Sequence, residues 1–407
     1  MKETIKGVCA PKGFFASGIW CGIKENSQKK DLALIYSQKI CGAAAVFTTN
    51  KVKAACIQVT KEHIANGKLR AIIANSGNAN ACTGEAGISA ARLMAQLVAD
   101  EFSISPDEVA VASTGVIGVP LPVTAIENNI YALKANMRDD EQGHADALEA
   151  IMTTDTRKKE IELEITINGS TVRIGAMAKG SGMIHPDMAT MLAFITTDAA
   201  ITTEALNSSL RCAVKHSFNR LTVDGDTSTN DMVLILANGE AGNSPISENT
   251  DSYNIFLSAL EKACVFLTRS MARDGEGATK LVTVTVSGAD SEEAAQALAK
   301  SVASSSLVKT ACFGADANWG RVLCAMGYAG VDFAPEKVSV SFLSGAGEVQ
   351  VCKNGINVHF SEKKAKQILL EDEIEILINL QDGDKTVSVW GCDLTYDYVK
   401  INGDYRS

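Results

Sequence analysis

Two runs of alternating apolar residues flank the dipeptide Asn168–Gly169, and no other feature constrains the fold of this chain as strongly. The runs 161–167 and 171–177 are typical of β-strands. Asn-Gly supplies the two positive φ angles that a tight turn needs, so the two strands are expected to form an antiparallel hairpin. A fold built only from alternating βαβ units is therefore disfavoured.

Apolar residues elsewhere recur with both the helical and the strand period, which predicts an α/β (α+β) chain. Helical spacing covers the segments 85–102, 141–152, 203–218, 252–268 and 292–304. Strand-like runs cover 71–74, 109–111, 161–167, 171–177, 191–195, 232–236, 281–286 and 338–342. We therefore expect a partly antiparallel sheet covered by helices.

No Pro/Ser/Gly-rich linker, internal repeat or low-complexity tract divides the 407 residues. A soft boundary lies near residues 277–280, after which strands and a helix could form a smaller unit. We predict a main domain over residues 1–280 and a smaller C-terminal α/β domain over 281–407.

Charge and composition exclude several classes of function. The net charge of -10 argues against a nucleic-acid or anionic-membrane surface, which would need clustered Lys and Arg. No run approaches the ~20 apolar residues that span a bilayer, and residues 1–6 lack the apolar run of a signal peptide. A cytoplasmic protein without membrane or nucleic-acid partners is expected.

Cysteine and histidine give no sign of a disulfide framework or a metal site. The 11 cysteines are odd in number and form no C-x-x-C pair. Several lie in apolar stretches and are expected to be small buried residues in a reducing compartment: Cys82, Cys212, Cys264 and Cys324. The five histidines form no H-x-x-x-H or H-E-x-x-H pair, and no G-x-S-x-G motif is present. We therefore expect no metal and no Ser-His-Asp hydrolase.

The segment 179–192 is the most informative stretch of the chain. It begins with Lys179 and a Gly-Ser-Gly tripeptide, and it places Thr190 at the mouth of the strand-like run 191–195. The residues alone favour an ordinary interpretation, with a surface turn, a solvated lysine and a half-buried threonine. The tripeptide does not continue into a phosphate-binding motif.

As a whole, however, the segment 179–192 resembles the self-cleavage segment of the glutamate/ornithine N-acetyltransferase family, enzymes of arginine biosynthesis. The resemblance extends over essentially the whole chain in the right order. Further matching segments are 13–14, 45–50, 75–84, 113–118, 151–156, 272–280 and 314–321.

The resemblance implies that the chain cuts itself between Ala189 and Thr190 and that Thr190 then acts as the nucleophile. The products would be an α chain (1–189) and a β chain (190–407) within a layered sandwich like that of self-cleaving aminopeptidases. Cleavage would give Thr190 an α-amino group with a pKa near ~8, so the amine can take up the hydroxyl proton as a general base.

The family also implies the residues around the nucleophile. Thr114 and Gly115 would stabilise the oxyanion, and we expect them in a turn after the strand 109–111. The implied substrate-binding residues are Thr153, Lys179, Thr190, Glu276, Asn402 and Ser407. We expect Lys179 to bind a carboxylate and Glu276 an ammonium group. The C-terminal tail, 398–407, would fold back over the site, although Ser407 departs from the threonine common in the family.

The activity implied is acetyl transfer from N2-acetyl-L-ornithine to L-glutamate, without metal or prosthetic group. Some family members also use acetyl-CoA, and the family assembles as an α2β2 heterotetramer. Two alternatives stay open: an amidohydrolase or aminopeptidase on the related self-cleaving fold, and a non-catalytic binding protein on the same scaffold.

Overall fold

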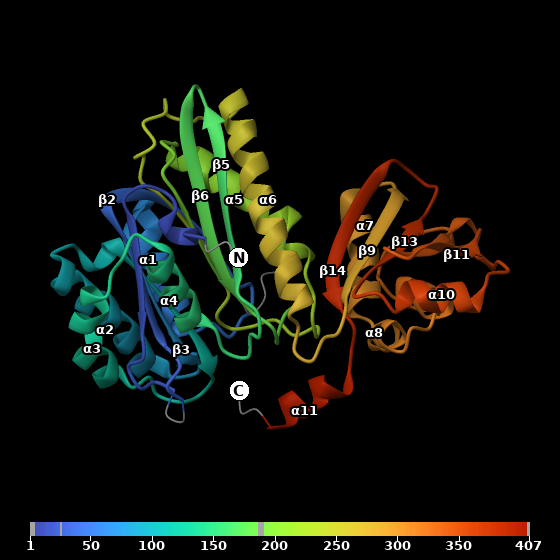
Figure 1. The fold of residues 1–407 in the computed structure, drawn as a ribbon, viewed down its shortest axis with the longest axis horizontal. Coiled ribbons are helices and arrows are strands. Elements are labelled where there is room, and N and C mark those ends of the chain that lie inside the picture. Colours follow the sequence, from blue (N-terminus) through green and yellow to red (C-terminus); the bar gives the residue numbers. More distant parts are fainter. Residues whose placement is uncertain (1–4, 25–26, 186–190, 405–407) are drawn as a thin grey trace.

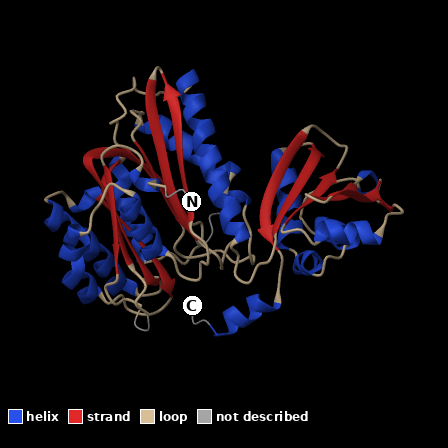
Figure 2. Ribbon diagram, viewed as in Figure 1, coloured by secondary structure: helices blue, strands red, loops and turns tan. Residues whose placement is uncertain are grey.

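The computed structural model describes residues 5–24, 27–185 and 191–404, which form two β-sheets covered by helices (Figure 1). Figure 2 shows helices packed beside the strands of each sheet. The helices are α1 (Ala55–His63), α2 (Gly84–Phe102), α3 (Val123–Ala135), α4 (Glu141–Ile151), α5 (Thr203–His216), α6 (Asp251–Arg273), α7 (Glu292–Ser304), α8 (Ser306–Phe313), α9 (Trp319–Gly327), α10 (Glu362–Leu369) and α11 (Tyr396–Asp404). None of the described helices is both long enough and apolar enough to cross a bilayer.

The first sheet has eight strands, seven of them in the order β4-β3-β2-β8-β7-β6-β5, with β1 paired to β2. Its strands are β1 (Phe14–Ile19), β2 (Leu32–Phe47), β3 (Lys68–Asn78), β4 (Val109–Val116), β5 (Lys159–Ile167), β6 (Ser170–Lys179), β7 (Leu192–Thr197) and β8 (Met232–Ala237). The pairs β3–β4 and β7–β8 are parallel and the other pairs are antiparallel.

The long strand β2 joins the two halves of this sheet. Its register shifts between Tyr36 and Cys41, and it pairs with β1 and β3 before the shift. Cys41 and Gly42 still pair with β3 after the shift, and the residues from Gly42 to Phe47 pair with β8. The sequence did not predict β2, because this part of the strand is rich in alanine, which has little β-propensity.

The predicted hairpin is confirmed. Strands β5 and β6 pair antiparallel around Asn168 and Gly169, whose φ angles are 49° and 80°. Both values lie in the left-handed region that an Asn-Gly turn requires. With mixed pairing in the sheet and helices packed on it, the predicted α/β class is confirmed as well.

Two apolar clusters lie against the first sheet. One joins residues of β1–β4 and of β6–β8 to the helices α1–α4, and the other joins residues of β5–β8 to α5 and α6. Helix α6 is amphipathic because its buried residues recur every three to four positions. They are Phe256, Leu260, Cys264, Leu267 and Met271. It continues to Arg273, beyond the expected end at residue 268.

The second sheet has six strands in the order β12-β11-β10-β13-β9-β14. Its strands are β9 (Leu281–Ala289), β10 (Ser339–Ser344), β11 (Gly347–Lys353), β12 (Ile356–Asn357), β13 (Glu373–Asn379) and β14 (Lys385–Cys392). A separate apolar cluster joins these strands to α7–α10. After β14 the chain leaves the sheet, and α11 lies beneath the junction of the two sheets (Figure 1). The division into domains at residue 280 stays a prediction.

Candidate active site

A pocket lies where the ends of several first-sheet strands meet the segment before β9 and helix α11. Its lining residues come from segments far apart in the sequence, which only the fold brings together. They are Ala79, Thr114, Gly115, Ile117, Thr153, Thr154, Lys179, Gly182, Met183, Ser228, Thr229, Asn230, Glu276 and Asn402.

Lys179, the last residue of β6, is the central cation of this pocket. It is 3% exposed, so the interpretation as a solvated surface lysine is wrong. Its Nζ donates a hydrogen bond of 2.8 Å to Thr153 Oγ1 and lies 3.4 Å from Thr114 Oγ1. Burial lowers the pKa of Lys179, while attraction to Asp155 opposes this effect. The side chain therefore presents a weakly solvated charge to the pocket.

Asp155 is the acidic partner of Lys179. Its Oδ1 accepts hydrogen bonds of 2.7 Å from both Lys159 Nζ and the Gly180 amide, and its Oδ2 lies 3.9 Å from Lys179 Nζ. Lys159 Nζ also contacts Asp274 Oδ2 at 2.5 Å. Burial alone would raise the pKa of Asp155, but attraction to Lys179 and Lys159 holds it well below its usual range. Asp155 was not predicted as a site residue from the sequence, although it lies within the matching segment 151–156.

Thr114 and Gly115 lie inside strand β4, not in a turn after it, so the expected turn is wrong. The strand continues to Val116. The register of β3 against β4 shifts at Asn78, and this residue still pairs with Thr114 and Val116. Gly115 has a φ of +134°, and a Cβ there would lie 2.3 Å from the backbone carbon of Gly77. Only glycine fits this position, which keeps the backbone beside Thr114 open to the pocket.

The proposed cleavage site itself lies outside the described residues, because these stop at His185 and resume at Met191. Both flanks are fixed by carboxylates. Asp224 accepts hydrogen bonds from the amides of Met183 and Ile184, at 2.6 and 2.8 Å, on one side. Asp231 Oδ1 accepts one of 2.9 Å from the Met191 amide on the other. The structure therefore tests neither the role of Ala189 nor that of Thr190.

Asp231 is a second residue near the site that was not predicted from the sequence. It directly precedes β8, is fully buried, and its Oδ2 has no hydrogen-bond partner within residues 5–24, 27–185 and 191–404. Burial raises the pKa of this carboxyl well above its usual range, and attraction to Lys179 opposes the effect only in part. The signal in the sequence was its place as an acid immediately before the apolar run 232–236.

Glu276 and Asn402 close the other side of the pocket. Asn402 Nδ2 donates a hydrogen bond of 2.8 Å to Glu276 Oε2, and the Glu276 amide donates one of 2.8 Å to the Ser181 carbonyl. A Cβ on Gly182 would lie 2.3 Å from Glu276 Oε2, so this glycine lets the carboxylate approach the segment after β6. Helix α11 thus reaches the site. Ser407 lies outside the described residues.

The tripeptide after Lys179 is not a surface turn. Ser181 is 1% exposed, and its hydroxyl lies 2.6 Å from Thr154 Oγ1. The structure therefore brings six of the predicted residues to one pocket: Thr114, Gly115, Thr153, Lys179, Glu276 and Asn402. Their roles in the reaction stay predictions.

Comparison with known proteins identifies the family. The model of the ArgJ family matches residues 15–407. The chain belongs to the ArgJ family. The arginine biosynthesis bifunctional protein ArgJ of Symbiobacterium thermophilum is 52% identical to this chain. The match extends over 408 residues and covers the full length of both proteins. ArgJ 1 of Clostridium acetobutylicum is 51% identical, with 97% of this chain and 96% of the relative covered. A solved structure of ArgJ from Bacillus halodurans is 44% identical to this chain, with a TM-score of 0.49. The match covers 52% of this chain and 97% of the solved chain.

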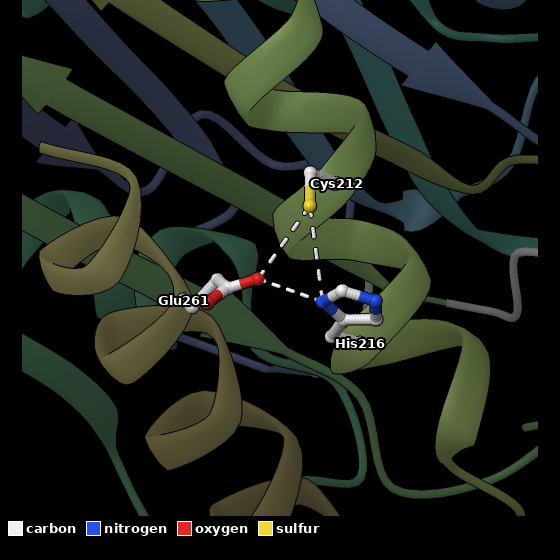
Figure 3. A group of neighbouring side chains, drawn as sticks. All are labelled: Cys212, His216 and Glu261. Carbon is white, nitrogen blue, oxygen red and sulfur yellow. Dashed lines mark hydrogen bonds and ion pairs between the residues drawn. The ribbon is translucent and has the colours of Figure 1, made fainter. Parts of the chain in front are cut away.

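In this ArgJ-family chain the cysteines are free, as expected, but not all of them are buried. Cys264 is buried, whereas Cys82 and Cys324 are exposed and Cys212 is partly exposed. The expected burial is wrong for these three. Cys212 and Cys324 lie on amphipathic helices but outside the buried face, which in α9 consists of Val322, Ala325 and Met326. The described residues also contain one group able to hold a metal, Cys212, His216 and Glu261 (Figure 3). Paired histidines in the sequence do not reveal this group, since only one of its members is a histidine.

Proposed function

We propose that this ArgJ-family enzyme cuts itself between Ala189 and Thr190 and then uses Thr190 to carry an acetyl group from N2-acetyl-L-ornithine to L-glutamate. The observation that carries the proposal is the shared pocket. It brings together the buried ammonium of Lys179, the carboxylate of Glu276 and the hydroxyl of Thr114, which is followed by Gly115. The pocket lies close to the start of β7, the strand that follows Thr190.

Self-cleavage is supported by how the flanks of the site are held. Asp224 binds the backbone amides of Met183 and Ile184, which precede the proposed cut, and Asp231 binds the amide of Met191, which follows it. Attack of Thr190 Oγ1 on the Ala189 carbonyl carbon needs the two to be held close together, and fixed flanks reduce the entropy lost in reaching that geometry. Strands β6 and β7 stay hydrogen-bonded on either side of the cut, so both halves would remain in one sheet.

In the transfer, Thr190 Oγ1 attacks the acetyl carbonyl carbon while its proton passes to its own α-amine. The bond to the ornithine nitrogen then breaks, and that nitrogen takes up the proton as ornithine leaves. The amine of glutamate then attacks the carbonyl carbon of the resulting ester, the bond from that carbon to Thr190 Oγ1 breaks, and this oxygen takes up the proton that the glutamate amine loses, passed through the α-amine of Thr190. Acetylglutamate is released, so every bond and proton balances without a metal or prosthetic group.

The Thr114 hydroxyl and the Gly115 amide would stabilise the oxyanion that forms in each step. Lys179 Nζ lies 3.4 Å from Thr114 Oγ1 and can donate to it, which leaves the hydroxyl proton free to point at the substrate. Lys179 would also attract the α-carboxylate of the substrate. Glu276, positioned by Asn402, would bind the side-chain ammonium of ornithine. Thr153 and Ser407 would complete the binding site.

Three finer features belong to the same proposal. We place the enzyme in the cytoplasm, because its cysteines form no disulfide and suit a reducing compartment. We expect an α2β2 heterotetramer of the two cleaved halves. We also expect acetyl-CoA to serve as a second acetyl donor, since the relatives cited above are named bifunctional.

Intact-mass spectrometry of the purified protein, combined with acetyl-transfer assays, tests the proposal. We expect two chains that begin at residues 1 and 190, and acetylglutamate formed in step with ornithine. Thr190→Ala should leave one uncut chain without transfer. Release of free acetate in place of acetylglutamate would favour the amidohydrolase alternative, and an uncut inactive wild-type chain would favour the binding protein. Glutamate with acetyl-CoA alone tests the second donor.

A further inference from the structure

Three side chains with metal-binding atoms meet between α5 and α6, outside the pocket described above. Cys212 and His216 stand one helical turn apart on α5, and Glu261 reaches them from α6 (Figure 3). Cys212 Sγ lies 3.8 Å from His216 Nδ1 and 3.6 Å from Glu261 Oε1. His216 Nδ1 lies 2.7 Å from the same oxygen.

These distances are close to those around a tetrahedral zinc ion. Bonds of about 2.3 Å to sulfur and about 2.0–2.2 Å to nitrogen and oxygen give sulfur-to-nitrogen and sulfur-to-oxygen separations of about 3.6 Å. The two observed sulfur distances agree with this geometry within a few tenths of an ångström. Only the pair His216 and Glu261, now joined by a hydrogen bond, would have to open, to about 3.4 Å.

The surroundings favour a cation and leave a path to it. The side chains of His216 and Glu261 are 33% and 30% exposed, so an ion can reach them from solvent. Lys215 lies 3.5 Å from Glu293 and Arg220 lies 3.7 Å from Glu292, so these two cations form their ion pairs with other acids, although Arg220 also attracts Glu261. The Glu261 carboxylate forms no ion pair with either of them and keeps an oxygen next to Cys212 and His216 for a bound ion.

We propose that Cys212, His216 and Glu261 bind one Zn²⁺ per chain, with the fourth position open to water. A thiolate, an imidazole and a carboxylate together match the ligand preference of zinc, whereas Mg²⁺ and Ca²⁺ prefer oxygen ligands. Binding replaces the thiol proton of Cys212, which is released to solvent, and moves the imidazole proton to Nε2. The ion would tie α5 to α6, which together cover β5–β8.

Zinc titration of the untagged, chelator-treated protein against a chromophoric chelator tests this site. We expect one tightly bound Zn²⁺ per chain in the wild type. We expect zinc binding to weaken at least about tenfold in each of three single variants: Cys212→Ser, His216→Gln and Glu261→Gln. Removing a residue that only hydrogen-bonds to a metal ligand already weakens binding by about this factor, so removing a ligand itself should cost no less. The double variant Cys324→Ser/His359→Gln, which changes an exposed cysteine and an exposed histidine elsewhere, should bind as the wild type does.

Cobalt gives a second readout that reports the ligand atoms of the bound metal and does not depend on activity. Co²⁺ in the wild-type protein should show a thiolate-to-metal charge-transfer band in the near ultraviolet, and Cys212→Ser should lack it while circular dichroism shows the same fold. Zinc should raise the melting temperature of the wild type but not of Cys212→Ser. Stoichiometric binding that persists in all three single variants, or no binding by the wild type, would overturn the proposal.

Discussion

The Met191 amide donates a hydrogen bond of 2.9 Å to Oδ1 of Asp231, a fully buried carboxyl at the start of the neighbouring parallel strand. Because Met191 directly follows Thr190, this bond fixes the backbone at the first residue beyond the proposed cut. We therefore expect Asp231 to position the chain for self-cleavage.

Asp231→Asn tests that role. The amide can still accept through one oxygen but introduces a donor into a buried place, which costs about 1–3 kcal/mol if it stays unpaired. We expect self-cleavage to slow at least about tenfold, measured from the uncut chain on denaturing gels over time. The exposed Asp226→Asn serves as control. Equal cleavage rates in both variants would remove Asp231 from the mechanism.

Lys179→Met should affect substrate binding more than cleavage. The buried ammonium is the cation we assign to a substrate carboxylate, and a hydrogen bond to a charged group contributes about 1.5–3 kcal/mol. We expect KM for acetylornithine to rise about 10- to 100-fold, while self-cleavage changes little. Asp155 keeps Lys159 and the Gly180 amide as partners, so the fold should persist. The exposed Lys51→Met is the control, and unchanged kinetics in Lys179→Met would refute the role.

Thr114→Val tests oxyanion stabilisation in the processed enzyme. Valine keeps the shape of the side chain but removes the donor, and loss of one such donor lowers kcat about 10²- to 10³-fold. Thr114→Ser restores the hydroxyl and should recover most of the activity. A valine variant as active as the serine variant would assign Thr114 to packing alone.

The C-terminal helix supplies a fourth prediction through Asn402, which donates to Glu276. Asn402→Ala should raise KM for acetylornithine about tenfold, because Glu276 loses the partner that orients it. Lys400→Ala, an exposed change on the same helix, should not. A tag at the C-terminus should impair turnover where an N-terminal tag does not, and two equally active tagged forms would argue against the role of the tail.

Asp155 should make the protein sensitive to acid. Its pKa in the fold is held below the ordinary value of 3.8 by Lys179 and Lys159, which outweigh the opposing effect of burial. A depressed pKa stabilises the folded state at pH values above 3.8, and this contribution disappears as the pH falls through that value toward the lower folded pKa.

Denaturation midpoints of the wild type and Asp155→Asn, followed by tryptophan fluorescence, measure this contribution. The gap between them should be large at pH 7, since breaking a buried ion pair costs about 3–5 kcal/mol. It should shrink as the pH falls below about 4. A gap that does not change with pH would mean that the charge of Asp155 contributes no stability.

The sequence by itself determined the local structure wherever a short-range rule applies. The Asn168–Gly169 turn fixes the β5–β6 hairpin through its two positive φ angles. Helix α7 follows Ser291, whose side chain accepts a hydrogen bond from the Ala294 amide, and its bounds were predicted to the residue. The motif around Lys179 also identified the pocket residues, because their order along the chain matched a known family.

Only the tertiary structure decided what surrounds those residues. Asp155 and Asp231 are ordinary acids in the sequence, and they become buried partners of the site because the end of β6 lies beside the starts of β7 and β8. Cys212, His216 and Glu261 meet only because α5 packs against α6. Burial and long-range packing set these environments, and both depend on segments tens of residues apart, which no local pattern encodes.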